Sequence, residues 1–198
     1  MKLGVIGGTF DPPHYGHLVL AENARVQFAL KGVLFVPAGQ PPHKPKEPIT
    51  PAHHRAAMVE AAIAGNPAFT LSRVDLDRPG PHFTVDMLGI LSRACPDAVL
   101  LFLMGGDSLA EFASWRNPLG IVRHARLGVM ERPGWEADVA ALAAEIPDIR
   151  GRLVLLDAPY LEISGTDLRR RVRRGLPIRY LVPPAVERYV REHRLYQG

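Results

Sequence analysis

The sequence contains only one cysteine and no long apolar run. The first fact excludes an internal disulfide, and the second excludes a membrane-spanning helix. Cys95 has no partner for an internal disulfide, so other interactions must hold the fold together. No run of eighteen apolar residues is present, as a membrane-spanning helix would require. Residues 1–3 lead directly into a strand pattern, without the apolar segment and cleavage site of a signal peptide. We therefore expect a soluble, cytoplasmic protein.

Length and composition are those of a globular domain. Of the 198 residues, 47% are hydrophobic and 22% are charged, which is enough to bury a substantial core. We expect one domain over residues 1–198. The formal net charge is +4 and the pI is near 9.5. This basic character fits either a surface that binds nucleic acid or a site that binds polyanionic nucleotides.

The segment GGTFDPPHYGH, from Gly7 to His17, has the features of a phosphate-binding turn. A short apolar strand pattern precedes it, and residues 15–30 follow it with helical spacing. Gly7 and Gly8 let the backbone approach a ligand, and the start of the helix directs unpaired N–H groups toward the end of the strand. We expect His14 and His17 on one face of the first helical turn, where both can donate hydrogen bonds to a phosphate chain.

Two alternative roles for these histidines compete with a phosphate site. One is an ordinary helix start with two solvated histidines. The second is a zinc site, but the sequence offers no third ligand nearby, since Cys95 is distant and the adjacent His53 and His54 diverge on a helix. We therefore predict an anion site and no metal held by protein ligands.

Short apolar segments alternate with helical spacing along the rest of the chain. Continuous apolar runs such as residues 99–104 are typical of strands that are buried on both faces of a parallel sheet. The pattern predicts an α/β fold with helices on both faces of the sheet and ligands at the carboxyl ends of its strands. The predicted strands cover residues 2–6, 33–36, 70–74, 99–104, 126–130 and 153–156.

A proline-rich stretch, residues 37–51, predicts a stiff loop after the second strand. Lys44 lies in this loop and can reach a phosphate, although a lone lysine there is more simply taken as solvated. Thr50 and Pro51 have the pattern of an N-cap and a first helical residue, which predicts a helix that runs to Ala64.

Three residues at later strand-to-helix junctions fit either a structural or a functional role. Thr84 is a candidate helix cap. Asp107 follows two glycines and can either accept hydrogen bonds from ribose hydroxyls or cap a helix. Trp115 offers a flat face on which an aromatic ring can stack, or it belongs to the core.

Residues 163–169, ISGTDLR, form the last motif. Ser164 or Thr166 is expected to cap a short helix. Arg169 belongs to a cluster of arginines of which most are expected to be solvated. Hydroxyls, helix N–H groups and a guanidinium are groups that bind phosphates.

These motifs resemble those of a known superfamily. Gly7 to His17 resembles the first signature of the HxGH nucleotidylyltransferases, whose two histidines stabilise the α-phosphate during nucleotidyl transfer. Residues 41–44, Pro-Pro-His-Lys, look like the substrate-phosphate loop of its bacterial nicotinate mononucleotide adenylyltransferases. Residues 163–169 are similar to their Ile-Ser-Ser-Thr-x-Ile-Arg motif, with Gly165 in place of the second serine.

The segment that begins at Arg78 resembles the Arg-x-Gly-x-Ser-Tyr-Thr-x-Asp-Thr-Leu pattern of the same family, but His82 and Phe83 replace the Ser-Tyr pair. The resemblance implies that backbone N–H groups near Thr84 and Arg116 receive a nicotinate carboxylate. It also implies that Asp107 contacts ribose and that Trp115 stacks on the nicotinate ring.

The resemblance spans nearly the whole chain. It implies a Rossmann-like, doubly wound parallel sheet with a short helical C-terminal segment. The implied reaction is adenylyl transfer from ATP to nicotinate mononucleotide in NAD biosynthesis, which gives nicotinate adenine dinucleotide (deamido-NAD) and pyrophosphate, with Mg²⁺ carried mainly by the ATP phosphates. The implied catalytic residues are His14, His17, Lys44 and Arg169; the ATP-binding residues are Gly7, Gly8, Thr9, Phe10, His14, His17, Asp107, Ser164, Thr166 and Arg169; the mononucleotide-binding residues are Lys44, Thr84, Trp115 and Arg116.

Two alternatives stay open at this stage. A related adenylyltransferase would use nicotinamide mononucleotide or phosphopantetheine as the acceptor. A basic nucleic-acid-binding or regulatory protein that keeps the fold without turnover is the alternative from a different class, and the intact histidines disfavour it. We expect no nucleic-acid or membrane partner, and the sequence leaves a homo-oligomer open.

Overall fold

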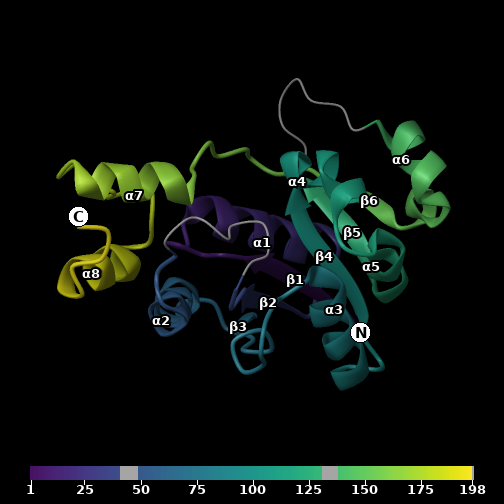
Figure 1. Ribbon diagram of the computed structural model, residues 1–198, viewed down its shortest axis with the longest axis horizontal. Helices are drawn as coiled ribbons and strands as arrows, with labels where there is room; N and C mark the ends of the chain where they lie inside the picture. The colour runs from purple at the N-terminus through teal and green to yellow at the C-terminus, as the bar shows by residue number, and fades with distance from the viewer. Residues whose placement is uncertain (41–48, 131–137, 198) are drawn as a thin grey trace.

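The computed structural model describes residues 1–40, 49–130 and 138–197, and all six of its strands lie in one parallel sheet (Figure 1). The strand order is β3-β2-β1-β4-β5-β6. The order reverses direction between β1 and β4, and in such sheets ligands bind at that point, beyond the carboxyl ends of the strands. The strands are β1 (Lys2–Gly8), β2 (Gly32–Pro37), β3 (Phe69–Leu71), β4 (Val99–Gly105), β5 (Ala125–Met130) and β6 (Leu153–Leu156).

Helices cover both faces of the sheet. Apolar side chains of α1 and α2 belong to the core layer on one face, and those of α3, α4 and α5 belong to the layer on the other. The two C-terminal helices, α7 and α8, form a third apolar cluster with α2. The helices are α1 (Tyr15–Gln27), α2 (Ala52–Ile63), α3 (Thr84–Ala94), α4 (Gly106–Ala110), α5 (Pro118–His124), α6 (Val139–Glu145), α7 (Gly165–Arg173) and α8 (Pro184–Glu192), with short 3₁₀ turns η1 (Phe112–Ser114) and η2 (Pro147–Gly151).

The central strand β4 is apolar throughout because both of its faces are buried. Phe102 and Met104 point into the layer that contains α3 and α5, whereas Leu101 and Leu103 point into the layer that contains α1 and α2. Successive side chains of a strand face opposite sides, so a strand covered on both faces needs apolar residues at every position. The predicted parallel sheet with helices on both sides is therefore confirmed.

Two predicted element boundaries were wrong. The helix expected over residues 15–30 ends at Gln27, because Ala29 adopts a left-handed conformation with φ of 51°. The strand expected at residues 70–74 is β3, Phe69–Leu71, and one further backbone hydrogen bond joins Ser72 N to Phe35 O.

Two predicted helix caps were also wrong. Pro51, not Thr50, is the N-cap of α2. Thr50 lies one residue earlier, where its backbone N–H donates to Asp11 and its carbonyl accepts from Arg55. Thr84 is the first residue of α3, and the extended residue before it, Phe83, occupies the N-cap position. Both helices start near their predicted positions but without side-chain caps.

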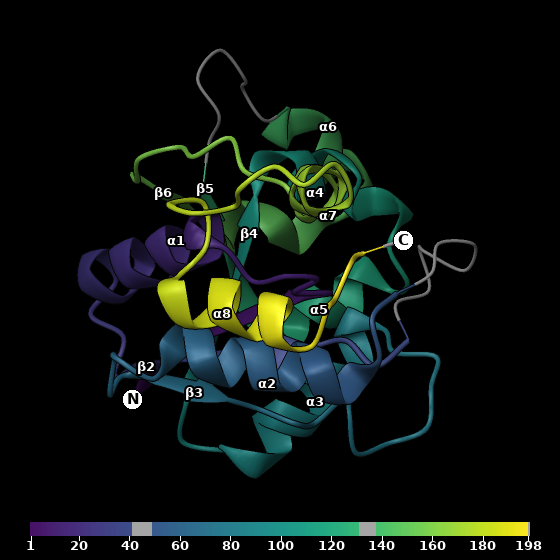
Figure 2. The ribbon, with the colours of Figure 1, turned by 90° about the vertical axis from the view of Figure 1, so that its left-hand side faces the viewer.

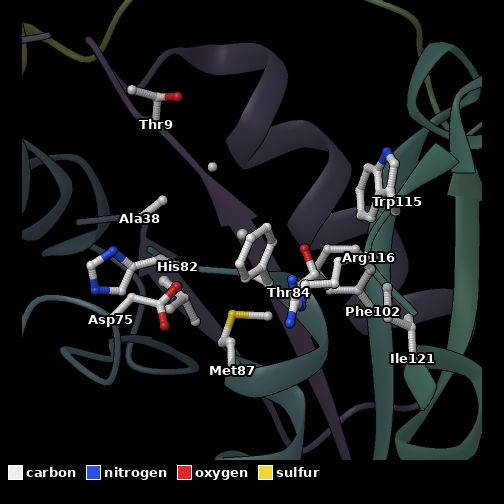
Figure 3. Close-up of a pocket in the computed structure, with 14 residues that line it drawn as sticks. Thr9, Ala38, Asp75, His82, Thr84, Met87, Phe102, Trp115, Arg116 and Ile121 are labelled. Carbon is white, nitrogen blue, oxygen red and sulfur yellow. The ribbon is translucent and has the colours of Figure 1, made fainter. Parts of the chain in front are cut away.

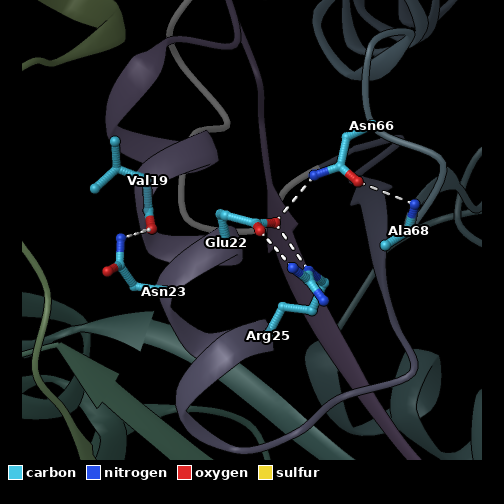
Figure 4. A network of polar contacts seen from close by, with 6 residues as sticks. All are labelled: Val19, Glu22, Asn23, Arg25, Asn66 and Ala68. Carbon is cyan, nitrogen blue, oxygen red and sulfur yellow. Dashed lines mark hydrogen bonds and ion pairs between the residues drawn. The ribbon is translucent and has the colours of Figure 1, made fainter.

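A polar network fixes α1 against the turn that precedes β3 (Figure 4). The Glu22 carboxylate accepts hydrogen bonds from Arg25 at 2.6 Å and from Asn66 Nδ2 at 3.0 Å. Asn66 Oδ1 in turn accepts the Ala68 N–H at 3.0 Å. These groups are partly exposed, so the network contributes more to the placement of α1 than to the total stability.

The C-terminal helices lie against the α2 side of the molecule. Helix α8 runs along α2 (Figure 2), and Val186 and Val190 of α8 pack in one apolar cluster with Met58 of α2 and Leu168 of α7. This packing brings residues beyond α8 toward the loop that follows β1. Within the described residues, no helix combines the length and the apolar character that crossing a membrane requires.

Candidate active site

Two cavities lie next to each other at the carboxyl ends of the central strands. The first, which we call the histidine cavity, has a volume of about 230 Å³ and joins the loop after β1 to the start of α7. More than 140 residues of sequence separate these segments, and the fold brings both signature motifs to one site. The histidine cavity is lined by Thr9, Phe10, Asp11, Pro12, His14, His17, Ser164, Gly165, Thr166 and Arg169.

The two histidines stack on each other at the start of α1. Their ring centroids are 3.8 Å apart, with 30° between the planes. His17 lies in the first helical turn, but the expectation for His14 was wrong, because it is the extended N-cap residue that precedes the helix. The His14 backbone N–H donates to His17 Nδ1 at 3.2 Å. The proton of a neutral His17 ring is therefore on Nε2.

The surroundings of His14 account for the glycine between the histidines. A Cβ atom on Gly16 would lie 3.0 Å from His14 Nδ1, so glycine leaves room for the stacked ring. His14 Nδ1 is buried and has no hydrogen-bond partner among the described residues. A buried N–H without an acceptor is rare, so the favoured neutral tautomer of His14 also carries its proton on Nε2.

Burial keeps both rings uncharged at neutral pH. His14 is 8% exposed, and burial lowers its pKa from 6.5 to about 4. Burial, together with the neighbouring His14, lowers the pKa of His17 well below 6.5. The site therefore offers a pair of neutral N–H donors rather than two positive charges.

Arg169 supplies positive charge to the same cavity from α7. Its Nη1 donates to the Asp11 carbonyl at 2.8 Å and its Nη2 to Thr166 Oγ1 at 3.3 Å. Ser164 is the N-cap of α7 and accepts the Asp167 N–H at 3.1 Å, which settles which of the two predicted hydroxyls caps the helix. The N-terminus of α7 adds its own partial positive charge to that of the guanidinium.

Close packing explains why position 165 holds a glycine where the family motif has a serine. A Cβ atom on Gly165 would lie 3.0 Å from the Asp11 carbonyl oxygen and 3.4 Å from Arg169 Nη1. The glycine thus lets the first turn of α7 approach the loop after β1 closely enough for Arg169 to reach Asp11.

The second cavity, which we call the tryptophan cavity, has a volume of about 150 Å³ (Figure 3). Whole-ligand sites usually measure about 300–1,000 Å³, so this cavity suits one part of a ligand, such as an aromatic ring. Trp115 and Arg116 lie on one side of it, across from His82, with Thr84 at the start of α3. The tryptophan cavity is lined by Gly7, Gly8, Thr9, Val36, Ala38, Asp75, His82, Phe83, Thr84, Met87, Phe102, Trp115, Arg116 and Ile121.

Aromatic contacts hold the tryptophan side of this cavity in place. The Trp115 ring packs against Phe112 and Phe102, with centroids 5.6 and 6.2 Å away. The Arg116 guanidinium carbon lies 4.7 Å from the centre of the Phe83 ring, a cation–π geometry. Phe83, a departure from the family pattern, therefore supports Arg116.

Sequence reasoning did not assign a role to His82, yet it is a buried residue of the cavity wall. Its Nδ1 accepts the Gln40 N–H at 2.8 Å, and its Nε2 contacts the Arg78 carbonyl at 3.0 Å. Cβ atoms on Gly39 and Gly80 would lie 2.7 and 3.0 Å from His82 Cε1, so both glycines make room for the ring. The histidine thus joins the loop after β2 to the turn before α3.

Asp75 is a second residue that the sequence did not reveal. It is buried in the cavity wall and forms an ion pair with Arg78 at 2.8 Å. Burial raises the pKa of its carboxyl group, and the Arg78 hydrogen bond opposes that shift. No local pattern marks Asp75, because its burial depends on segments that are distant in sequence.

The structure distributes the expected site residues between the two cavities. Thr9 lines both, so it lies at their junction. Gly7 and Gly8, expected at the ATP, line the tryptophan cavity instead. Asp107 lines neither cavity and is exposed in the first turn of α4. Lys44 lies outside the described residues.

No group of three His, Cys, Asp or Glu side chains that could hold a metal ion occurs within residues 1–40, 49–130 and 138–197. In the described lining of the histidine cavity, the one carboxylate is that of Asp11. Both of its oxygens already accept hydrogen bonds, from Tyr196 and from the Thr50 backbone.

Comparisons with known proteins agree with this geometry. The cytidylyltransferase-like family model matches residues 5–171. A protein named probable nicotinate-nucleotide adenylyltransferase from Thermomicrobium roseum is 50% identical over 196 residues, which cover 99% of this chain and 92% of the relative. A protein of the same name from a Roseiflexus species is 45% identical, with 98% of each chain covered.

A solved structure shares the fold at low sequence identity. The Plasmodium falciparum nicotinic acid mononucleotide adenylyltransferase complexed with NaAD superposes with a TM-score of 0.78 at 22% identity, over 98% of this chain and 97% of the other. This likeness confirms the predicted Rossmann-like sheet with its helical C-terminal segment. With the family match and the full-length relatives, the chain belongs to the nicotinate-nucleotide adenylyltransferases of the cytidylyltransferase-like family.

Proposed function

We propose that this chain transfers the adenylyl group of ATP to nicotinate mononucleotide, forming nicotinate adenine dinucleotide and pyrophosphate. The observation that carries the proposal is the pair of cavities that meet at Thr9. One cavity is lined by phosphate-binding groups and the other by an aromatic wall, so a nucleoside triphosphate and a pyridine mononucleotide can bind side by side with their phosphates at the junction.

In the proposed reaction, a phosphate oxygen of the mononucleotide attacks the α-phosphorus of ATP in line with the leaving pyrophosphate. The new P–O bond forms as the bond to the β-phosphate oxygen breaks, and pyrophosphate leaves with that electron pair. The attacking phosphate is already anionic at neutral pH, so no protein nucleophile or general base is needed. Catalysis then depends on alignment and on stabilisation of negative charge.

The described residues have distinct roles in this scheme. His14 and His17 donate Nε2–H groups to the α-phosphate, on which negative charge develops in the transition state. Arg169 and the N-terminus of α7, with Ser164 and Thr166, bind the remaining ATP phosphates. We retain Lys44 as the contact to the mononucleotide phosphate and Asp107 as a ribose contact, both from the sequence motifs.

We propose that Mg²⁺ enters as its complex with ATP. When bound, the ion neutralises charge on the phosphate oxygens. The described lining of the histidine cavity fits this arrangement because Asp11, its one carboxylate, is occupied by two hydrogen bonds. The protein residues would therefore bind the phosphates rather than the ion itself.

The tryptophan cavity supports a preference for nicotinate over nicotinamide. Thr84 begins α3, where backbone N–H groups lack intrahelical acceptors, and these donors suit a carboxylate. A carboxamide would direct an NH₂ group at them and leave a buried polar group unpaired, at a cost of about 1–3 kcal/mol. We expect a ratio of roughly tenfold to a hundredfold in kcat/KM.

The test is a pyrophosphate-release assay with ATP, Mg²⁺ and a panel of acceptors: nicotinate mononucleotide, nicotinamide mononucleotide and phosphopantetheine. Nicotinate mononucleotide should give the highest kcat/KM. A higher value for phosphopantetheine, or a nicotinate-to-nicotinamide ratio near one, would contradict the proposed acceptor.

The same assay tests the role of the histidines. His17→Ala should lower kcat on the order of 100-fold, because it removes a donor to the reacting phosphate. The KM for nicotinate mononucleotide should change little. Turnover within about threefold of the parent would remove His17 from the mechanism, since an ordinary hydrogen bond is already worth about that much.

A further inference from the structure

The chain beyond α8 turns back toward the histidine cavity. Arg194 and Tyr196 both adopt left-handed conformations, with φ of 50° and 64°. Residues other than glycine rarely adopt this backbone conformation, so surrounding interactions must hold the turn. The turn places the Tyr196 hydroxyl 2.7 Å from Asp11 Oδ1, to which it donates a hydrogen bond across 185 residues of sequence.

Asp11 connects this hydroxyl to the candidate ATP-binding groups. The residue is 5% exposed, and its other carboxylate oxygen, Oδ2, accepts the Thr50 N–H at 3.2 Å. Its backbone carbonyl accepts the hydrogen bond from Arg169 Nη1 at 2.8 Å. The position of Asp11 therefore sets the position of Arg169, and Asp11 also lies three residues before His14.

The Tyr196 hydroxyl is not needed merely to dock α8. Val186 and Val190 already pack in an apolar cluster with Met58 of α2, which buries the inner face of the helix. Burial and the adjacent Asp11 carboxylate raise the pKa of Tyr196, so the phenol keeps the proton that it donates. A charged acceptor and a neutral donor form a hydrogen bond of above-average strength.

We propose that Tyr196 is a positioning residue for the reaction. By holding the Asp11 carboxylate, it fixes the loop after β1 and Arg169 in the arrangement that binds the ATP phosphates, and the C-terminal turn thereby becomes part of the ATP site. The proposal rests on the proposed function, in which Arg169 and the histidines contact ATP.

The first test compares Tyr196→Phe with Tyr189→Phe. The control is matched, because the Tyr189 hydroxyl also makes a hydrogen bond, to His54 Nδ1 at 3.0 Å. Asp11 lines the histidine cavity, whereas His54 lines neither cavity. Tyr196→Phe should lower kcat/KM for ATP about tenfold, the value of one hydrogen bond to a charged group, and change the KM for nicotinate mononucleotide less than twofold. Tyr189→Phe should leave both values unchanged.

Binding of a non-hydrolysable ATP analogue with Mg²⁺, measured by calorimetry, separates this proposal from the proposed function. Tyr196→Phe should weaken that binding about tenfold whichever acceptor the enzyme uses. If the parent binds the analogue but transfers adenylyl to none of the acceptors, the proposed function fails while this comparison still stands. Equal binding by the two phenylalanine variants would overturn the positioning role.

A double-mutant cycle tests whether Tyr196 acts through Asp11. In Asp11→Asn, an amide NH₂ or oxygen faces the donors from Tyr196 and Thr50. This variant should also bind the ATP analogue more weakly than the parent. The double variant Asp11→Asn/Tyr196→Phe should bind the analogue no more weakly than Asp11→Asn alone, because both changes break the same contact. Additive losses would show that Tyr196 does not act through Asp11. A lower Tm in Tyr196→Phe with unchanged kcat and KM for ATP would show that the tyrosine only stabilises the fold.

Discussion

At the scale of single residues, the uncharged state of the two histidines is the property that most affects the proposed chemistry. Burial keeps both rings uncharged, so the phosphate site presents neutral donors on one side and Arg169 on the other. Negative phosphates next to the rings would favour their protonated forms and raise both pKa values. ATP binding is therefore expected to be accompanied by proton uptake.

The low pKa of His14 predicts that the protein loses stability in mild acid. The folded-state pKa is about 4, below the ordinary value of 6.5, so this contribution is complete above pH 6.5 and is lost as the pH falls toward 4. Between pH 7 and pH 5 the loss amounts to about 2 kcal/mol of the free energy of unfolding. Urea denaturation at the two pH values, in a buffer without phosphate, measures it.

The control for that measurement is His14→Gln, which cannot take up the proton. Its loss between pH 7 and pH 5 should be smaller than that of the parent by about 2 kcal/mol. The His17 pKa shift has the same direction, so some acid sensitivity should persist in the variant. Identical losses in parent and variant would show that His14 is not buried as a neutral ring.

At the scale of elements, the loops after β1 and β2 and the turn before α3 are joined by side chains rather than by regular secondary structure. His82 bridges the Gln40 N–H and the Arg78 carbonyl, and so holds one wall of the tryptophan cavity. A serine at this position, as in the family pattern, is too short to span both groups. The departure from that pattern therefore changes how the wall is held.

We predict that His82→Ser lowers the free energy of unfolding by about 1–3 kcal/mol, because a buried N–H and a buried carbonyl lose their partners. The KM for nicotinate mononucleotide should rise, while the KM for ATP should change little, since His82 lines the tryptophan cavity but not the histidine cavity. Denaturation and steady-state kinetics measure the two effects. His53→Ser, at an exposed histidine, is the control, and equal behaviour of the two variants would contradict the bridging role.

At the scale of the whole molecule, one buried arginine joins three segments beneath the site. Arg55 of α2 donates hydrogen bonds to four backbone carbonyls, at distances from 2.7 to 3.0 Å. They belong to the loop after β1, the loop after β2 and the segment just before α2. The planar guanidinium can satisfy several acceptors at once, which a lysine cannot do in the same geometry. The acceptors are the carbonyls of Thr9, Ala38, Gly39 and Thr50.

Arg55→Met should lower the free energy of unfolding by about 3 kcal/mol or more, because several buried carbonyls lose their donor at once. The matched control is Arg188→Met, an exposed arginine of α8, which should shift stability by no more than about 0.5 kcal/mol. Chemical denaturation at pH 7 measures both. A loss in Arg55→Met as small as in the control would mean that the loops are held by other contacts.

Local patterns were sufficient to predict most of the fold. The apolar run at residues 99–104 indicated a strand that is buried on both faces, and β4 is that strand. The motif from Gly7 to His17 predicted a strand, a turn and a helix in the right order. Side-chain periodicity and turn chemistry are set by neighbouring residues, so a sequence records them directly. The predicted cap at Thr50 was wrong, and the backbone N–H of that residue bonds to Asp11, 39 residues away in the sequence.

The sequence by itself determined the α/β class, the positions of nearly all strands, and the residue types of both signature motifs. Only the tertiary structure decided that Arg169 bonds to the Asp11 carbonyl, that Tyr196 reaches the Asp11 carboxylate, and that His82 closes the cavity wall. These contacts join segments that no local pattern relates. Their formation depends on the strand order, which places the ends of β1 and β4 together, and on the packing of the C-terminal helices against α2.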